Sequence, residues 1–284
     1  MRILITGING FIAGSLGEYL AHERGHGIRG TLRKETPKRE WCEETCYFEL
    51  GKELSPGMLD GVDTVVHAAH DFRKGAGEIN IRATRSLALA ALESGVKRQV
   101  YISSYSARED AVSEYGQTKY ALERFFITVR GISVRPGVVV GSGGIFLRIA
   151  GLVKRFPVVP LLDAGRGDVP VIGTDNLNEA LGKIIEGPEP EAVYNLINRE
   201  HSSLKAIVQA ICKAKGYRRL CLPVPSSLVI SPLAFLKKLG IGTPIDIDNV
   251  RAFIRNQTTE YESDLGRLGI CESTVEEMVA KALR

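Results

Sequence analysis

Tyr115 and Lys119 are the two residues whose types and spacing point most directly to chemistry. A free tyrosine has a pKa of about 10, which is too high for a general base near neutral pH, so it needs a nearby cation that favours the phenolate. Side chains four residues apart share one face of an α-helix, which would bring the Lys119 ammonium close to the Tyr115 hydroxyl. Such a pair can move a proton to or from a substrate oxygen.

Ser104 is a candidate for holding that oxygen. It follows a strand predicted at Gln99–Ser103, and open α/β sheets bind their ligands at the carboxyl ends of the strands. Ser103 and Ser106 are alternatives, because side chains alternate between the two faces of a strand and only one face can meet a substrate.

The elements that would position these side chains alternate along the first 140 residues. Strands are predicted at the β-branched runs Arg2–Thr6, Gly27–Leu32, Thr64–Ala68, Gln99–Ser103 and Ile132–Arg135. Helices are predicted at Gly10–Arg24, Ile79–Ser94 and Tyr115–Val129, where apolar residues recur at helical spacing. Successive βαβ units predict an α/β fold with a doubly wound parallel sheet covered on both faces.

Residues 6–14 read TGINGFIAG, directly after the first strand and at the start of the first helix. This is the position of a dinucleotide-binding turn. Gly7 permits a tight turn, Gly10 lets backbone N–H groups approach a pyrophosphate, and Ala13 lets the helix pack close to the strand. The pyrophosphate would lie at the positive helix N-terminus, against Asn9, Phe11 and Ile12.

The end of the second strand decides between the two nicotinamide dinucleotides. Proteins that bind NAD carry a carboxylate there, which hydrogen-bonds the ribose 2′-hydroxyl. Proteins that bind NADP carry cations there, which bind the 2′-phosphate. The segment Ile28–Lys34 (IRGTLRK) contains no acid and three bases. Arg33 and Lys34 therefore favour NADP(H), with NAD(H) as the alternative.

Together these segments resemble the extended and atypical short-chain dehydrogenases/reductases, also called the NAD-dependent epimerase/dehydratase family. The resemblance covers residues 1 to about 200, and its motifs are the glycine turn, HAA at His67–Ala69, Asn80 at the start of NIRATRSL, YISS at Tyr101–Ser104, YGQTK at Tyr115–Lys119, and RPGVVVG at Arg135–Gly141. The third glycine of the family's turn is Ala13 here. The resemblance favours Ser104 among the serines, and implies Tyr115 as acid/base, Lys119 as its activator and a ligand of the ribose, and Ser104 as polariser.

Further site residues are predicted beside these motifs. The cofactor contacts are His67, Ala68, Ala69, Pro136, Val138 and Val139, and the substrate contacts are His70 and Asp71. Asn80 either caps a helix or reaches the active site. No metal is predicted, because Cys42 and Cys46 have no second Cys/His pair at suitable spacing.

The second half has a different character. Residues 155–168 (RFPVVPLLDAGRGD) are predicted as a long functional loop. A helix from about Thr174, a strand at Val193–Ile197, and helices at Leu204–Lys215, Leu228–Leu239 and Val275–Leu283 follow. We expect a Rossmann domain of residues 1–141 and about 174–198, and a smaller, mostly helical substrate-binding part of residues 142–173 and 199–284.

Composition limits the class of protein. The 284 residues are 44% hydrophobic with a net charge of +4 of mixed signs, which predicts a soluble globular chain without a nucleic-acid surface. No apolar stretch reaches about 20 residues, so no membrane contact is expected. Five cysteines with no leader sequence indicate reduced thiols in the cytoplasm. A homodimer is possible, since family members often dimerise.

The function predicted is an NADP(H)-dependent oxidoreductase that transfers hydride between the nicotinamide and a carbonyl or secondary alcohol of a small molecule. One alternative is a nucleotide-sugar epimerase or dehydratase that retains its cofactor. Asp168 weakens it, because nucleotide-sugar enzymes of the family commonly carry an arginine there, for which Arg148, Lys154, Arg155 or Arg166 could substitute. A second alternative is a non-catalytic NADP(H)-binding redox sensor, which would not need Tyr115 and Lys119.

Overall fold

The computed structural model describes residues 1–34, 39–188, 191–228 and 262–284. The chain divides into two compact units. The first unit contains Met1–Glu109, Glu114–Pro136 and Leu177–Leu196, and the second contains Asp110–Ser113, Gly137–Asn176 and Ile197–Arg284. The helix predicted at Leu228–Leu239 lies outside the described residues apart from its first residue. No helix in the described ranges has the length and apolar character needed to cross a bilayer.

The first unit is built on a seven-stranded sheet in which every neighbouring pair is parallel. In sheet order its strands are β11 (Val193–Leu196), β6 (Ile132–Pro136), β5 (Arg98–Ile102), β4 (Thr64–His67), β1 (Arg2–Ile5), β2 (Gly27–Leu32) and β3 (Glu44–Tyr47). Strand order reverses between β1 and β4, which is where doubly wound sheets open a ligand crevice. The predicted doubly wound fold is confirmed.

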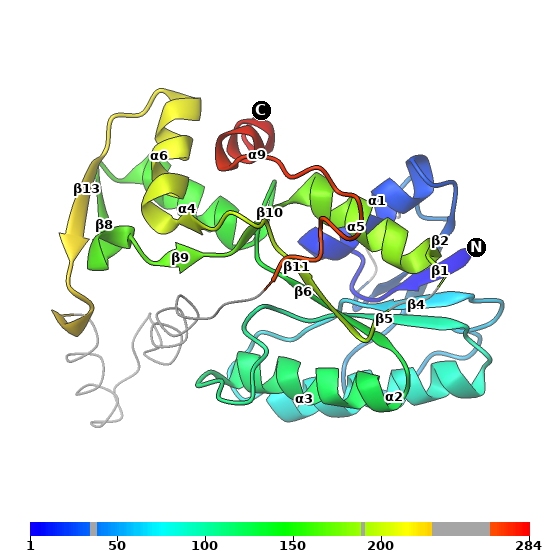
Figure 1. Cartoon of the computed structure of the whole chain (residues 1–284). Coiled ribbons are helices and arrows are strands. Elements are labelled where there is room, and N and C mark those ends of the chain that lie inside the picture. The colour runs from blue at the N-terminus through cyan, green and yellow to red at the C-terminus, as the bar shows by residue number, and fades with distance from the viewer. Residues whose placement is uncertain (35–38, 189–190, 229–261) are drawn as a thin grey trace. The chain divides into compact units, whose positions relative to one another are not determined.

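Helices cover both faces of this sheet. Helices α2 (Gly77–Glu93) and α3 (Glu114–Thr128) lie side by side on one face, and α1 (Phe11–His22) and α5 (Thr174–Glu186) lie on the other (Figure 1). Strand β4 is buried along its whole length, and β1 is buried after its first residue. Strands covered on both faces read as continuous apolar runs, and this explains why they were readable from the sequence.

Strand β3 was not predicted. It pairs with β2 alone, at the edge of the sheet, and its residues are largely exposed. An edge strand without a buried apolar run leaves little local signal.

The second unit combines helices with three two-stranded sheets. Its helices within the described residues are α4 (Gly144–Arg155), α6 (Leu204–Lys215) and α9 (Val275–Ala282). The strand pairs are β7 (Val138–Val140) with β10 (Val171–Gly173), β9 (Asp168–Val169) with β12 (Ser202–Ser203), and β8 (Val158–Leu162) with β13 (Leu220–Val224). A core that includes Phe146, Val153, Val171, Ile207 and Val279 joins these elements.

The prediction of one long loop over residues 155–168 was wrong. The segment contains β8 and a short 3-10 helix, Asp163–Gly165. Strand β8 is completed by β13, which follows about sixty residues later, and such a distant pairing leaves no local pattern.

Candidate active site

The turn between β1 and α1 has the shape that its glycines predict. Gly7 has a φ of 70°, a conformation that favours glycine, and its N–H donates to Thr31 Oγ1 at 3.0 Å. A Cβ at Gly7 would lie 3.2 Å from Ala69 Cα, and one at Gly10 would lie 3.1 Å from the Gly7 carbonyl oxygen. No side chain caps α1, and its first turn contains no acid. These features fit a pyrophosphate held by backbone N–H groups.

Thr6 joins this turn to the end of β4. Its hydroxyl oxygen accepts the N–H groups of both Ala68 and Ala69, each at 2.9 Å. The two backbone segments that border the crevice are thereby fixed to each other. Sequence reasoning did not single out Thr6.

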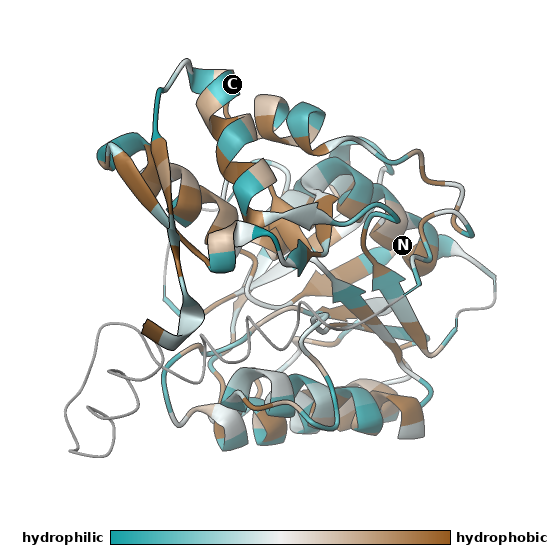
Figure 2. Ribbon diagram, turned by 60° about the vertical axis from the view of Figure 1, so that its left-hand side comes forward, coloured by the Kyte–Doolittle hydropathy of each residue, from teal (hydrophilic) through white to brown (hydrophobic). Residues whose placement is uncertain are grey.

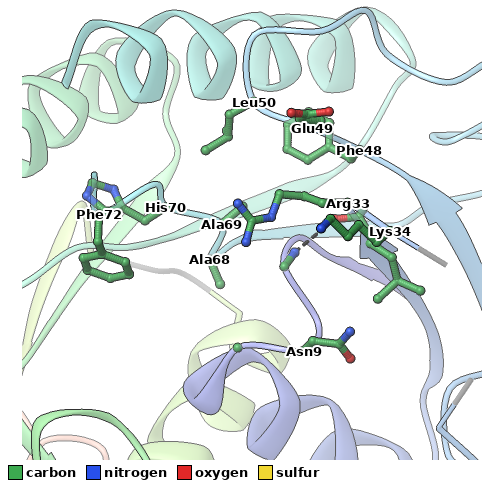
Figure 3. A pocket seen from close by; sticks show the side chains of 14 residues that line it. Asn9, Arg33, Lys34, Phe48, Glu49, Leu50, Ala68, Ala69, His70 and Phe72 are labelled. Atoms are coloured by element: carbon green, nitrogen blue, oxygen red, sulfur yellow. Dashed lines mark hydrogen bonds between the residues drawn. The ribbon is translucent and has the colours of Figure 1, made fainter. Parts of the chain in front are cut away.

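A cavity of about 670 Å³ lies in the first unit above this turn (Figure 3). The predicted residues that line it are Gly7, Asn9, Gly10, Arg33, Lys34, Ala68, Ala69 and His70. Further lining residues that the sequence did not single out are Thr31, Leu32, Phe48, Glu49, Leu50 and Phe72. In Figure 3 the Arg33 and Lys34 side chains lie on one side of the cavity, and His70 and Phe72 lie at its far end.

Ser104, Tyr115 and Lys119 come together beside that far end. The Ser104 hydroxyl hydrogen-bonds Tyr115. His70 and Phe72 both pack on the Tyr115 ring, with ring centres 5.2 and 5.9 Å away. Burial raises the pKa of Tyr115 above its ordinary value, and the hydrogen bond with Ser104 partly opposes this. Without a bound cofactor, Tyr115 therefore holds its proton at neutral pH.

Lys119 is 4% exposed and lies one turn from Tyr115 on α3, as its spacing predicts. Its Nζ donates to the Ile102 carbonyl oxygen at 2.7 Å and lies 5.6 Å from the centre of the Tyr115 ring. Burial lowers the pKa of Lys119 to about 7, and the charge of Glu123 partly opposes this. The ammonium can thus lose its proton close to neutral pH.

Ser103 does not compete with Ser104 for the site. Its hydroxyl donates to Glu123 Oε1 at 2.5 Å. Glu123 also accepts two hydrogen bonds from Arg135, at 2.9 and 2.6 Å, and is 1% exposed. A buried ion pair therefore connects α3 to the ends of β5 and β6.

Asn80 neither caps a helix with its side chain nor lines the cavity. Its Oδ1 accepts the Asp71 N–H at 2.8 Å, and its Nδ2 donates to the carbonyl oxygens of Asp71 and Ala76, both at 2.9 Å. Asn80 therefore holds the segment that carries His70 and Phe72. The Asp71 carboxylate is paired with Arg73, which lowers the pKa of Asp71 to about 2.

The other predicted contacts lie away from the cavity lining. The His67 ring is buried, bonds Gln99 Oε1 at 2.9 Å and packs against Phe126. Phe11 and Ile12 belong to the first turn of α1, Pro136 ends β6, and Val138 and Val139 belong to the second unit. Their contacts with a cofactor stay predictions. No cluster of metal-binding side chains occurs within the described part of the chain.

Residues 3–148, just over half of the 284 residues, match the profile of the NAD dependent epimerase/dehydratase family. The chain belongs to this family. The resemblance inferred from the motifs is confirmed, and with it the expectation of an enzyme family that uses a nicotinamide cofactor. The choice of NADP(H) over NAD(H) stays a prediction.

Two curated relatives of this family member are named a dehydrogenase/isomerase and a reductase. A 3 beta-hydroxysteroid dehydrogenase/Delta 5-->4-isomerase of Mycobacterium tuberculosis is 26% identical over 178 residues, which are 50% of this chain and 48% of that enzyme. A ceramide reductase of Caulobacter vibrioides is 29% identical over 171 residues, 56% of this chain and 53% of that enzyme. The chain thus spans about half the length of each of these two relatives.

Among solved structures, the UDP-glucose 4-epimerase of Thermotoga maritima with UDP-glucose superposes with a TM-score of 0.73. The superposition covers 100% of this chain and 97% of that one at 17% identity. At this identity the likeness shows a shared fold.

Proposed function

We propose that this family member is an NADP(H)-dependent oxidoreductase that reduces a carbonyl, or oxidises a secondary alcohol, of a small molecule. The observation that carries the proposal is the grouping of Ser104, Tyr115 and Lys119 beside the far end of the glycine-turn cavity. A protein that only bound a dinucleotide would not need a buried lysine next to a half-buried tyrosine.

In this proposal each side chain has one task. When bound, the cofactor supplies or accepts the hydride. In the direction of reduction, the Ser104 hydroxyl would hold the carbonyl oxygen, and the Tyr115 hydroxyl would donate to that oxygen the proton of the new O–H bond, which leaves a phenolate on Tyr115. Lys119 then favours the phenolate left on Tyr115 and holds the ribose of the cofactor.

The cavity also has features that suit the adenosine end of a dinucleotide. Phe48 and Leu50 are apolar walls, and the Glu49 carboxylate can accept a hydrogen bond from an amino group of the base. Arg33 and Lys34 line the cavity where β2 ends, the place of the 2′-phosphate in this fold. We assign these two cations to NADP(H).

The oxidoreductase proposal is favoured over a nucleotide-sugar epimerase or dehydratase by two observations. The two curated relatives described above are named a dehydrogenase/isomerase and a reductase. Asp168 is exposed, and its Oδ2 lies 3.9 Å from Nδ1 of His201. This position therefore carries a carboxylate, whereas binding of a diphosphate would call for a cation. The epimerase remains the second candidate because the Thermotoga maritima enzyme, which shares this fold, is a UDP-glucose 4-epimerase with UDP-glucose.

The test is an assay of the purified chain with NADPH and a panel of ketones that includes a 3-ketosteroid. We expect net loss of NADPH, and we expect Tyr115→Phe to lower kcat by about 10²- to 10⁴-fold while NADPH binding is kept. The matched control is Tyr120→Phe on the same helix, which should retain activity. Conversion of UDP-glucose without net consumption of cofactor would favour the epimerase. If Tyr115→Phe left every measured activity unchanged, the non-catalytic NADP(H)-binding redox sensor would be favoured.

A further inference from the structure

The sheet formed by β8 and β13 exposes an apolar face. The two strands are parallel, and their register pairs Val158 with Leu220 and Pro160 with Leu222. Paired residues point to the same face of a sheet, so these four side chains form one patch. Val158 is 40% exposed, Leu220 63% and Leu222 48%, and Pro160 is exposed as well. Both strands are largely brown, with paler stretches, in the hydropathy view of Figure 2.

The other face of the same sheet is an ordinary buried face. Val159 and Leu161 alternate with the exposed residues of β8 and are 8% and 2% exposed, within the core of the second unit. A strand with one buried face normally carries polar residues on the other. Here both faces are apolar, and contiguous exposed apolar surface marks a site of interaction.

Cations gather at one end of this patch. Lys154 and Arg155 precede β8, and Arg218 and Arg219 precede β13, so the parallel arrangement brings both pairs to the same end of the sheet. Arg219 is held there, because its Nε donates to the Val153 carbonyl oxygen at 2.7 Å and its Nη2 to that of Lys154 at 3.0 Å. Lys154, Arg155 and Arg218 are exposed.

The elements around the patch carry charge of one sign. Helices α4 and α6 and strands β8 and β13 contain no acidic residue, and all their charged residues are Lys or Arg. Among the neighbouring residues, Asp163 follows β8 at the opposite end of the sheet, where its carboxylate accepts the Ser226 N–H at 2.8 Å. The patch is therefore apolar in the middle and cationic at one end.

We propose that this patch docks on the surface of an anionic phospholipid bilayer. The apolar side chains would enter the boundary between head groups and acyl chains, while the four cations would stay among the phosphate and carboxylate groups. Neither part suffices alone, since stable association with a membrane surface needs both apolar burial and electrostatic attraction. The proposal departs from the expectation, based on the lack of a long apolar span, that the chain does not contact membranes. It does not depend on the proposed reaction.

The test is co-sedimentation of the full chain with phosphatidylcholine vesicles that contain or lack phosphatidylserine. We expect binding to the anionic vesicles that weakens with added salt. Leu220→Gln/Leu222→Gln should lower the binding constant at least tenfold, and Arg155→Gln/Arg218→Gln should lower it roughly 25-fold, at about fivefold per cation. The matched control is Leu89→Gln/Leu92→Gln, which removes leucines that are 45% and 42% exposed on α2 and should leave binding unchanged.

Three outcomes would overturn the proposal. The first is a failure of the wild-type chain to bind either kind of vesicle, or equal vesicle binding by the wild type and by the two double variants of the patch, Leu220→Gln/Leu222→Gln and Arg155→Gln/Arg218→Gln. The second is a wild-type chain that binds neither kind of vesicle and is destabilised by Leu220→Gln/Leu222→Gln, which would assign the patch to packing within the chain itself. The third is a dimer in the absence of lipid that this variant converts to a monomer, which would assign the patch to a second copy.

Discussion

The ammonium group of Lys119 donates a 2.7 Å hydrogen bond to the carbonyl oxygen of Ile102, the last residue of β5. That bond ties the helix that carries Tyr115 to the strand that leads to Ser104. Within the described part of the chain, this carbonyl, two aromatic rings and the charge of Glu123 compensate for the burial of the lysine. Burial of the charged ammonium lowers the free energy of unfolding. This cost depends on pH, because Lys119 loses its proton near pH 7.

The first prediction concerns that cost. The pKa of Lys119 is about 7 in the folded chain and 10.5 when unfolded, so between these values the unfolded chain holds more protons and the free energy of unfolding rises with pH. Replacing Lys119 by Met removes the titrating group. We expect the thermal midpoint of Lys119→Met, relative to wild type, to be higher at about pH 6 than at about pH 10. Equal differences at the two pH values would show that the ammonium is not buried in solution.

The second prediction concerns Glu123. Glu123→Gln removes the counter-charge of Arg135, whose side chain is only 18% exposed, and breaking such a largely buried pair costs about 3 to 5 kcal/mol of unfolding free energy. The double change Glu123→Met/Arg135→Met removes both charges and should cost less than the single change. Chemical denaturation of the three proteins measures this order. Loss of Glu123 should also lower the pKa of Lys119 further, because the carboxylate raises it in the wild type.

The parts of the site that local patterns encode are predictable from the sequence. The glycine turn, the Tyr115–Lys119 spacing and the buried strands each leave a signal within a few residues. The partnership of Glu123 with Arg135 does not, because the two residues lie on different elements and meet only when α3 packs against β6. Phe48, Glu49 and Leu50, which line the cavity directly after β3, were not predicted because β3 itself was not predicted. An exposed edge strand shows no clear alternation of apolar and polar residues.

The third prediction concerns acid sensitivity. Burial lowers the pKa of His67 to about 4 from an ordinary value of 6.5. A buried neutral histidine stabilises the fold above pH 6.5, and this contribution is lost as the pH falls toward 4, because the unfolded chain takes up the proton first. The contribution is about 3 kcal/mol. We expect the unfolding free energy of wild type to fall more than that of His67→Gln between neutral pH and about pH 4. Parallel pH profiles for the two proteins would contradict it.

The fourth prediction concerns the choice of cofactor. A charge-assisted hydrogen bond from Arg33 to a 2′-phosphate is worth about 1.5 to 3 kcal/mol, so Arg33→Ser should weaken NADPH binding by about 10- to 150-fold and leave NADH binding nearly unchanged. Titration of each cofactor against the protein measures both affinities. Arg82→Ser, on the exposed surface of α2, is the matched control and should change neither. Equal affinity of the wild type for NADH and NADPH would contradict the prediction, because Arg33 and Lys34 would then not bind a 2′-phosphate. In that case Glu49, which lines the same cavity, becomes the better candidate for the residue that sets cofactor choice.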